Sequence, residues 1–173
     1  MTDLKRFIRD VPDFPKPGIM FRDITPLLAH GSAWQQTVNH MADQYRGRVD
    51  VVLGIESRGF LLGAAVAYTL GCGVAVVRKP GKLPAATFNA SYALEYGTDT
   101  LEIHQDAFTP GSRVLVIDDL LATGGTAEAA IALTRQLRGE VVAAAFIIEL
   151  TFLNGRQRLV PCDVFSLVQY DSE

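Results

Sequence analysis

Short runs of apolar residues alternate with helical patterns along most of the chain. The runs are rich in Val and Ile and are mostly continuous, which is typical of strands covered on both faces of a parallel sheet. We expect five such strands, at residues 49–55, 74–77, 114–117, 141–148 and 164–168.

Two amphipathic stripes lie between these runs. Residues 34–45 place apolar side chains on one helical face and are followed by Gly47. Residues 127–137 form a second stripe, with basic residues at its end and Gly139 just beyond. Both patterns predict helices that end at a glycine. Strands that alternate with helices indicate βαβ units, so we predict an α/β fold with a central parallel sheet flanked by helices.

An uncharged segment, residues 59–77, is long enough to suggest a membrane span. Gly71 and Gly73 interrupt it, however. We therefore predict a buried helix at residues 60–70, a glycine turn and a short strand. The charged N-terminal residues lack the apolar run of a signal peptide. We expect a cytoplasmic protein without a membrane partner.

The N-terminal region departs from the α/β pattern. Residues 12–18 contain three prolines and a glycine, which exclude regular structure there. We predict that about residues 1–30 form a small lobe, the hood, which crosses over the sheet.

A second departure covers about residues 79–104. It opens with a basic, Pro- and Gly-containing loop at 79–84 that we expect to be mobile. Alternation through Tyr92, Leu94, Tyr96, Leu101 and Ile103 then predicts a β-hairpin that rises out of the sheet, with its turn at 97–99. A long loop that ends in a hairpin inside a compact domain is typical of a lid.

Composition narrows the class of protein. The chain has 173 residues, 49% of them hydrophobic and 20% charged, which matches one globular domain spanning 1–173. A net charge of −3 argues against a nucleic-acid partner. Cys72 and Cys162 are too few and too scattered for a disulfide framework or a zinc site, so we expect buried free thiols in a reducing compartment.

The strongest chemical signal lies at residues 114–126. An apolar strand delivers Asp118 and Asp119 and is followed by a loop of small residues that opens a helix. Backbone N–H groups at such a helix start bind phosphate, and the hydroxyls of Thr123 and Thr126 add donors. Carboxylates beside a phosphate suit the hydroxyls of a ribose 5-phosphate. The alternative is that Thr123 only caps the helix and the glycines make a turn.

A second candidate loop, residues 54–59, has the glycine spacing of a Walker A loop. Phe60 and Leu61 stand where its Lys and Ser/Thr belong, so a nucleoside-triphosphatase is excluded. Arg58 follows a predicted strand and could fork onto phosphate oxygens, or it could be a surface cation. With Arg58, the cations Arg78, Lys79 and Lys82 could clamp a diphosphate; alone, they would form a solvated loop.

Residues 114–126 resemble the phosphoribosyl pyrophosphate signature of type I phosphoribosyltransferases. Segments 14–25, 54–60, 78–84 and 94–97 narrow the resemblance to the adenine phosphoribosyltransferases. The blocks occur in the family's order and together cover residues 14 to 149. The resemblance implies the type I fold, with an N-terminal hood and a flexible hairpin lid.

The resemblance also implies a role for each matching residue. The 5-phosphate would bind Ala122, Thr123, Gly124, Gly125 and Thr126. The diphosphate would bind Glu56, Ser57, Arg58, Arg78, Lys79, Lys82 and Tyr96, with a cis peptide at Glu56–Ser57. Adenine would lie among Met20, Phe21, Arg22 and Leu120, although Phe21 could instead be a core residue. Asp118 and Asp119 would hold the ribose, and Glu95 would close over the site as a third catalytic residue.

The implied reaction makes AMP and diphosphate from adenine and phosphoribosyl pyrophosphate, as in purine salvage. Mg²⁺ would arrive with the diphosphate and need no direct protein ligand. The family is typically dimeric, so a homodimer is expected. The three histidines, His30, His40 and His104, have no metal-ligand spacing and are expected to be structural or solvent-exposed.

Two alternatives stay open from the sequence. One is a transferase for xanthine or another 6-oxopurine, against which the Phe21-Arg22-Asp23 segment argues. The other is a regulator that only senses phosphoribosyl pyrophosphate. Such a regulator should carry a DNA-binding domain or a basic face, and neither is expected here.

Overall fold

The computed structural model describes residues 3–93 and 98–172, and its centre is a parallel sheet with the strand order β4-β3-β7-β8-β9. The strands are β3 (Val51–Ile55), β4 (Gly73–Val77), β7 (Arg113–Leu121), β8 (Glu140–Leu150) and β9 (Val164–Tyr170). All five predicted strands are confirmed.

Strand β7 is longer than its apolar run predicts. Its expected end was residue 117, but Asp118, Leu120 and Leu121 continue to pair with β8. Backbone hydrogen bonds to β8 keep the chain extended here in spite of the polar side chains of Asp118 and Asp119. These two residues therefore lie within the C-terminal part of β7 and not in the loop beyond it.

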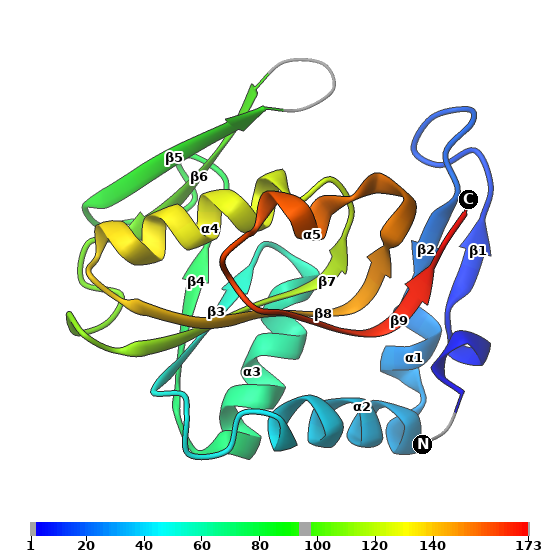
Figure 1. Ribbon diagram of the computed structural model, residues 1–173, viewed down its shortest axis with the longest axis horizontal. Coiled ribbons are helices and arrows are strands. Elements are labelled where there is room, and N and C mark those ends of the chain that lie inside the picture. The colour runs from blue at the N-terminus through cyan, green and yellow to red at the C-terminus, as the bar shows by residue number, and fades with distance from the viewer. Residues whose placement is uncertain (1–2, 94–97, 173) are drawn as a thin grey trace.

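Helices cover both faces of this sheet (Figure 1). Helices α2 (Gly31–Asp43) and α3 (Arg58–Leu70) lie on one side, and α4 (Gly125–Gln136) and α5 (Gly155–Arg158) on the other. Side chains of β7 alternate between the two cores: Leu115 and Ile117 pack with α2 and α3, whereas Val114 and Val116 pack with α4. Burial on both faces explains why the strand runs are continuously apolar.

The predicted helices are confirmed with small shifts at their ends. Helix α3 ends at Gly71, whose φ of +71° is a left-handed cap. Within the described residues, no helix is both long enough and apolar enough to cross a membrane. Cys72 and Cys162 are free thiols, as expected, but the prediction that they are buried is wrong, because both are only partly buried.

The hood contains more regular structure than the prolines suggest. A short 3₁₀ helix, η1 (Leu4–Phe7), precedes β1 (Arg9–Val11), which pairs antiparallel with β2 (Phe21–Asp23). The intervening residues 12–18 are irregular, as predicted. Helix α1 (Thr25–Ala29) then leads into α2.

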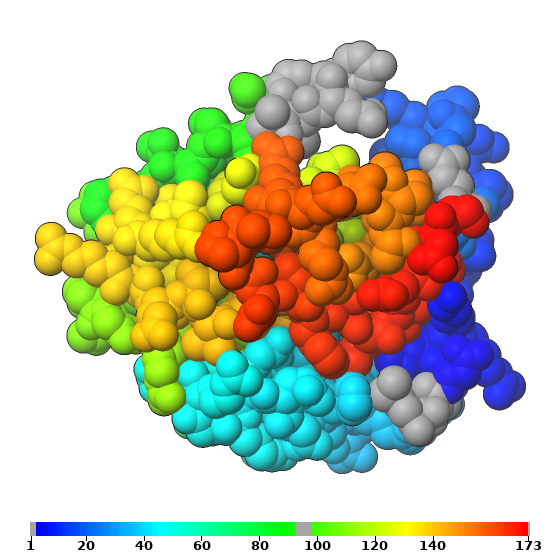
Figure 2. Space-filling model, viewed as in Figure 1, coloured from blue at the N-terminus to red at the C-terminus, as the bar shows by residue number. Residues whose placement is uncertain are grey.

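The hood is fixed to the far edge of the sheet through Arg22. This side chain is only 6% exposed, and its Nη1 lies 2.5 Å from Oδ1 of Asp10. Its guanidinium carbon lies 4.0 Å from the centroid of the Tyr170 ring, at the end of β9. Figure 2 shows the N-terminal segment in blue against the C-terminal strand in red. A cation–π contact therefore joins the N-terminal hood to the C-terminal strand β9.

The predicted hairpin forms a separate two-stranded sheet from β5 (Thr87–Ala93) and β6 (Thr98–His104). The expected turn at 97–99 is wrong, because Thr98 and Asp99 belong to β6 and Asp99 pairs with Tyr92. The predicted positions Leu94 to Gly97 lie outside the described residues. Leu101 and Ile103 are fully buried in the core that α4 shares, so the base of the hairpin is packed.

Candidate active site

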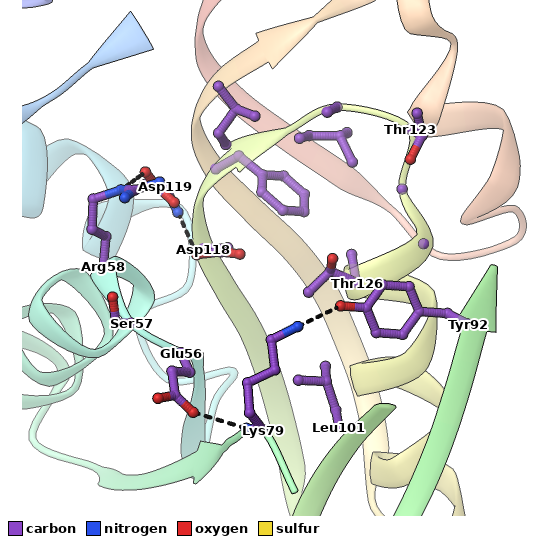
Figure 3. Close-up of a pocket in the computed structure, with 17 residues that line it drawn as sticks. Glu56, Ser57, Arg58, Lys79, Tyr92, Leu101, Asp118, Asp119, Thr123 and Thr126 are labelled. Carbon is purple, nitrogen blue, oxygen red and sulfur yellow. Dashed lines mark hydrogen bonds and ion pairs between the residues drawn. The ribbon is translucent and has the colours of Figure 1, made fainter. Parts of the chain in front are cut away.

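A cavity of about 320 Å³ opens at the carboxyl edge of the sheet (Figure 3). Ligands of open α/β sheets bind at this edge, where loops after adjacent strands converge. Described residues predicted for the site and lining this cavity are Glu56, Ser57, Arg58, Lys79, Asp118, Asp119, Leu120, Ala122, Thr123, Gly124, Gly125 and Thr126. The structure thus brings together the blocks at 54–59 and 114–126.

The two carboxylates differ in their surroundings because successive strand residues point to opposite faces. Asp119 is buried and forms an ion pair with Nε of Arg58. Asp118 accepts a hydrogen bond of 2.9 Å from the backbone N–H of Asp119. Loss of solvent, followed by the charge of Asp119, raises the pKa of Asp118 well above its ordinary value. The pair therefore holds less than two full negative charges over part of the pH range.

The loop at 122–126 has the geometry of an anion site. Gly124 is the N-cap of α4, with a φ of +85°, and it offers no side-chain cap to the helix. Thr123 is therefore not the capping residue, and the alternative of a simple N-cap is wrong. Because a helix start has N–H groups without intrahelical partners, this loop can donate them to a phosphate.

The loop at 54–59 contains the predicted cis peptide at Glu56–Ser57. Glu56 accepts hydrogen bonds from the backbone N–H of Lys79 at 2.8 Å and from Nη2 of Arg78 at 3.1 Å. The hydrogen bond from Arg78 is the main cause that lowers the pKa of Glu56. Glu56 thus anchors the start of the lid to the loop after β3.

The basic cluster is largely neutralised by carboxylates. Nζ of Lys79 contacts Asp99 and also donates to Tyr92 Oη at 3.1 Å. Burial alone would lower the pKa of Lys79, but the bonds to Asp99 and Tyr92 outweigh it and the pKa is raised. Of the four predicted cations, Arg58 and Lys79 line the described part of the cavity wall, whereas Arg78 and the exposed Lys82 lie outside it.

A second cavity, of about 400 Å³, lies beside the first, between the hood and the end of β8. Met20 and Arg22 line it, together with Leu150 and Phe152. Thr123 lines both cavities, so they meet at the phosphate loop. The guanidinium of Arg22 forms an ion pair with Asp10 and a cation–π contact with Tyr170.

Phe21 occupies neither the core nor the described lining of the two cavities. Its ring lies 5.3 Å from the guanidinium carbon of Arg58 and 5.1 Å from the ring of Phe14 in an edge contact. The predicted adenine residues are therefore divided: Leu120 lines the first cavity, Met20 and Arg22 line the second, and Phe21 lies next to Arg58.

Several lining residues carried no chemical motif in the sequence. In the first cavity they are Tyr92, Leu101, Leu121, Ala127 and Phe146, and in the second they include Leu150, Phe152 and Leu153. Tyr92 could have been found, because the hairpin alternation points it inward. The others are ordinary apolar residues whose position depends on the tertiary fold.

The histidines have structural contacts. His30 caps α2 by accepting a hydrogen bond of 3.3 Å from Ala33, and Nε2 of His104 accepts one of 3.3 Å from Ala85. The ring of His40 lies 6.1 Å from that of Phe165. Among the described residues, no group of three or more His, Cys, Asp or Glu side chains is arranged to hold a metal ion.

Comparisons with known proteins agree with this geometry. A family model for the phosphoribosyl transferase domain matches residues 27–167. The adenine phosphoribosyltransferase of Solibacter usitatus is 59% identical over 172 residues, which cover 99% of both chains. The crystal structure of adenine phosphoribosyltransferase from Thermoanaerobacter pseudethanolicus has a TM-score of 0.94 at 50% identity and covers 97% of this chain and 98% of its own.

A third relative was solved with ligands. The Saccharomyces cerevisiae adenine phosphoribosyltransferase, complexed with D-2,5-dideoxy-2,5-imino-altritol 1,6-bisphosphate and adenine, has a TM-score of 0.90 at 40% identity. The alignment covers 95% of this chain and 96% of the yeast chain. With a family match over most of its length and full-length relatives at this identity, the chain belongs to the phosphoribosyltransferase family, among the adenine phosphoribosyltransferases.

Proposed function

We propose that this chain transfers the 5-phosphoribosyl group from phosphoribosyl pyrophosphate to adenine, giving AMP and diphosphate in purine salvage. The observation that carries the proposal is the junction at Thr123. There, a cavity with a phosphate loop and two carboxylates meets a second, mainly apolar cavity. A ribose 5-phosphate fits the first and a purine ring fits the second.

The phosphoribosyl group is held by the end of β7 and the start of α4. Backbone N–H groups of residues 122–126 and the hydroxyls of Thr123 and Thr126 bind the 5-phosphate. Asp118 and Asp119 accept hydrogen bonds from the ribose hydroxyls. Their negative charge also stabilises the oxocarbenium-like ribose that forms as the C1–O bond breaks.

The diphosphate binds to the cations on the opposite wall. Arg58 and Lys79 line the first cavity, together with Glu56 and Ser57. Arg58 is paired with Asp119. A diphosphate that takes Arg58 releases Asp119 for the ribose, so one exchange prepares both ends of the breaking bond. Arg78 and Lys82 support this wall from outside the cavity.

Adenine enters the second cavity. Met20 and Arg22 border it, and the apolar side chains of Leu150 and Phe152, which line the same cavity, pack on the ring. Leu120 contacts the purine from the first cavity. Phe21 lines neither cavity, and its contact with the purine follows from the family resemblance alone. Glu95 and Tyr96 lie outside the described residues, and their closure over the site follows from the family resemblance alone.

The site suits Mg²⁺ that arrives with the diphosphate. Mg²⁺ prefers oxygen ligands and keeps several waters, and the cavity offers the carboxylate oxygens of Asp118 and Asp119 for indirect contacts. When bound, the ion neutralises negative charge on the leaving diphosphate.

The chain acts as one domain in a cytoplasmic homodimer. Exposed apolar side chains on α3 and the edge strand β4 support the dimer: Leu61, Tyr68 and Val74 are exposed by 55%, 89% and 50%. Such exposed apolar side chains are available for a protein interface. The loop at 56–58 begins α3, so the diphosphate site would lie near the subunit boundary.

One assay tests the function. Purified protein is incubated with Mg²⁺, phosphoribosyl pyrophosphate and each of adenine, hypoxanthine, guanine and xanthine, and the nucleotide formed is measured. Adenine should give AMP and a stoichiometric amount of diphosphate. Nucleotide formation from a 6-oxopurine in preference to adenine, or from none of the four bases, would contradict the proposal.

A further inference from the structure

The segment that follows β8 lies against the outside of the phosphate loop. It consists of η2 (Thr151–Leu153), Asn154 and α5, and we call residues 151–158 the support segment. Figure 1 shows α5 in orange beside the end of β7 and the start of α4.

Gly155 makes the contact, backbone against backbone. A Cβ atom on Gly155 would lie 2.1 Å from the carbonyl oxygen of Ala122 and 3.0 Å from the nitrogen of Gly124. A Cβ atom on Gly124 would lie 2.7 Å from the carbonyl oxygen of Gly155. The distances of 2.1 Å and 2.7 Å leave no room for a side chain at either position, so the loop and the support segment fit together only as glycine against glycine.

Arg156, the next residue, ties the support segment to the sheet. Its Nε and Nη2 donate to the two carboxylate oxygens of Glu149 at 2.9 and 2.5 Å, and its Nη1 donates to the carbonyl of Val164 at 2.5 Å. Ser166 Oγ donates to the same carboxylate at 2.6 Å. Glu149 is only 3% exposed at the end of β8.

The charge of Glu149 is retained in this buried position. Burial would raise its pKa, but the hydrogen bonds from Arg156 and Ser166 outweigh the burial and the pKa is lowered. A bidentate pair of this kind fixes direction as well as distance. The other end of the support segment is held more loosely, by Arg158 Nε, which donates to Glu128 of α4 at 2.5 Å in a half-exposed pair.

We propose that Gly155 and Arg156 are positioning residues for the phosphate loop: Arg156 fixes the support segment on Glu149, and Gly155 holds the loop's backbone so that its N–H groups converge on one phosphate. This rests on the proposed function, since the 5-phosphate is taken as the ligand of the loop. Neither residue is among the described residues that line the first cavity. Donors that are held in place before the ligand arrives bind it without the cost of ordering the loop.

The experiment measures binding of ribose 5-phosphate by titration calorimetry, with KM for adenine and thermal unfolding as further readouts. The variants are Gly155→Ala, Arg156→Gln and Arg156→Lys. Gly31→Ala is the matched control for the first, because a Cβ on Gly31 meets nothing within 4 Å. Arg113→Gln is the matched control for the loss of an arginine pair, because Arg113 donates to both carboxylate oxygens of Asp50 and to the carbonyl of Gly47.

Gly155→Ala should weaken ribose 5-phosphate binding by about 10-fold or more, and Arg156→Gln by a smaller factor that Arg156→Lys partly restores. Both controls should bind like the wild type. KM for adenine should change by less than about threefold, although Phe152 and Leu153 of the same segment line the second cavity. If Gly155→Ala does not fold, the same comparison of Arg156→Gln with Arg156→Lys decides.

Three results would overturn the inference. Folded Gly155→Ala and Arg156→Gln proteins that bind ribose 5-phosphate like the wild type leave the loop independent of the support segment. Equal losses for adenine and ribose 5-phosphate with a lower Tm indicate a general structural role. If the wild type binds no ribose 5-phosphate, the proposed function itself is wrong. This result differs from the first two, because there the wild type binds the ligand and only the comparison with the variants fails.

Discussion

Arg58 donates through its Nε to the carboxylate of Asp119, so a residue assigned to the diphosphate is bound to one assigned to the ribose. The arginine side chain is 41% exposed and the aspartate only 7%. Burial would lower the pKa of Arg58, but the charge and hydrogen bond of Asp119, together with the charges of Asp118 and Asp23, outweigh it and the pKa is raised. The pair joins the loop after β3 to the end of β7 across the cavity.

Replacing Arg58 by Ala should raise KM for phosphoribosyl pyrophosphate by about 10- to 100-fold and lower kcat, because hydrogen bonds to charged groups contribute roughly 1.5–3 kcal/mol. Adenine affinity should change little. Steady-state kinetics and titration with diphosphate check this, with Asp119→Asn added for a double-mutant cycle. Equal losses of adenine and diphosphate binding would refute the division of roles.

Asp118→Asn should separate activity from stability. It removes a charge that stabilises the ribosyl transition state, so kcat should fall by about 100-fold or more. The pKa of Asp118 is raised in the folded state, which means that folding favours its protonated form. The stability that this form contributes is complete below the pKa of the unfolded state and is lost as pH rises through the pKa of the folded state. Asn does not ionise, so the variant should melt at a higher temperature than the wild type at pH 8. This advantage should vanish as pH falls to about 4. Wild-type turnover at saturating substrate would exclude the ribose assignment.

Asp99→Asn should tighten diphosphate binding. Lys79 is paired with Asp99, so a diphosphate must compete for the ammonium group. The pair is partly exposed, and an ion pair near the surface contributes about 0.2–1 kcal/mol, so Kd for diphosphate should fall by about 1.4- to 5-fold. Asp106→Asn, an exposed carboxylate beyond β6, is the control for a change in net charge. Tightening by both variants alike would indicate a long-range charge effect and not release of Lys79.

Tyr170→Leu should raise KM for adenine while KM for phosphoribosyl pyrophosphate stays the same. The ring supports the guanidinium of Arg22, and Arg22 borders the second cavity. A cation–π contact contributes about 0.5–2 kcal/mol, so an increase of about two- to thirtyfold is expected. Tyr170→Phe keeps the ring face and should behave like the wild type. If Phe and Leu have the same effect, the ring does not act through Arg22.

Glu95→Gln tests a residue that lies outside the described part of the chain. As a site residue it should lower kcat at saturating substrate with little effect on diphosphate affinity, since a closed lid strengthens its bond to adenine. As a surface partner of Lys82 it should shift the melting temperature slightly and leave kinetics unchanged. A pH–rate profile and a melting curve distinguish the two, and unchanged turnover at every pH removes Glu95 from the mechanism.

The central sheet could be predicted because its strands are buried on both sides. Alternate residues of β7 face two different cores, so the run from Val114 to Ile117 has to be apolar throughout. The hood strands could not, because β1 and β2 have three residues each and mix charged with apolar positions. Ion pairs and the ring of Tyr170 stabilise them, and such distant contacts leave no local pattern.

The site could be predicted as a set of residues but not as a set of pairs. Loops after adjacent parallel strands meet at one edge, which places residues 54–59 beside 118–126. Which carboxylate neutralises which cation depends on the lid register. The misplaced turn at 97–99 would have taken Asp99 out of the strand that brings it to Lys79.

The contact between Arg22 and Tyr170 also has a consequence for the order in which the molecule is completed. Arg22 leaves the ribosome long before Tyr170, and before Leu150, which forms a wall of the second cavity. The hood is therefore synthesised early and stays without its aromatic support until nearly all of the described chain has emerged. Contacts of such large sequence separation form slowly. The half of the site assigned to the purine is thus made first and finished last, and a nascent chain that stalls before residue 150 has no purine pocket.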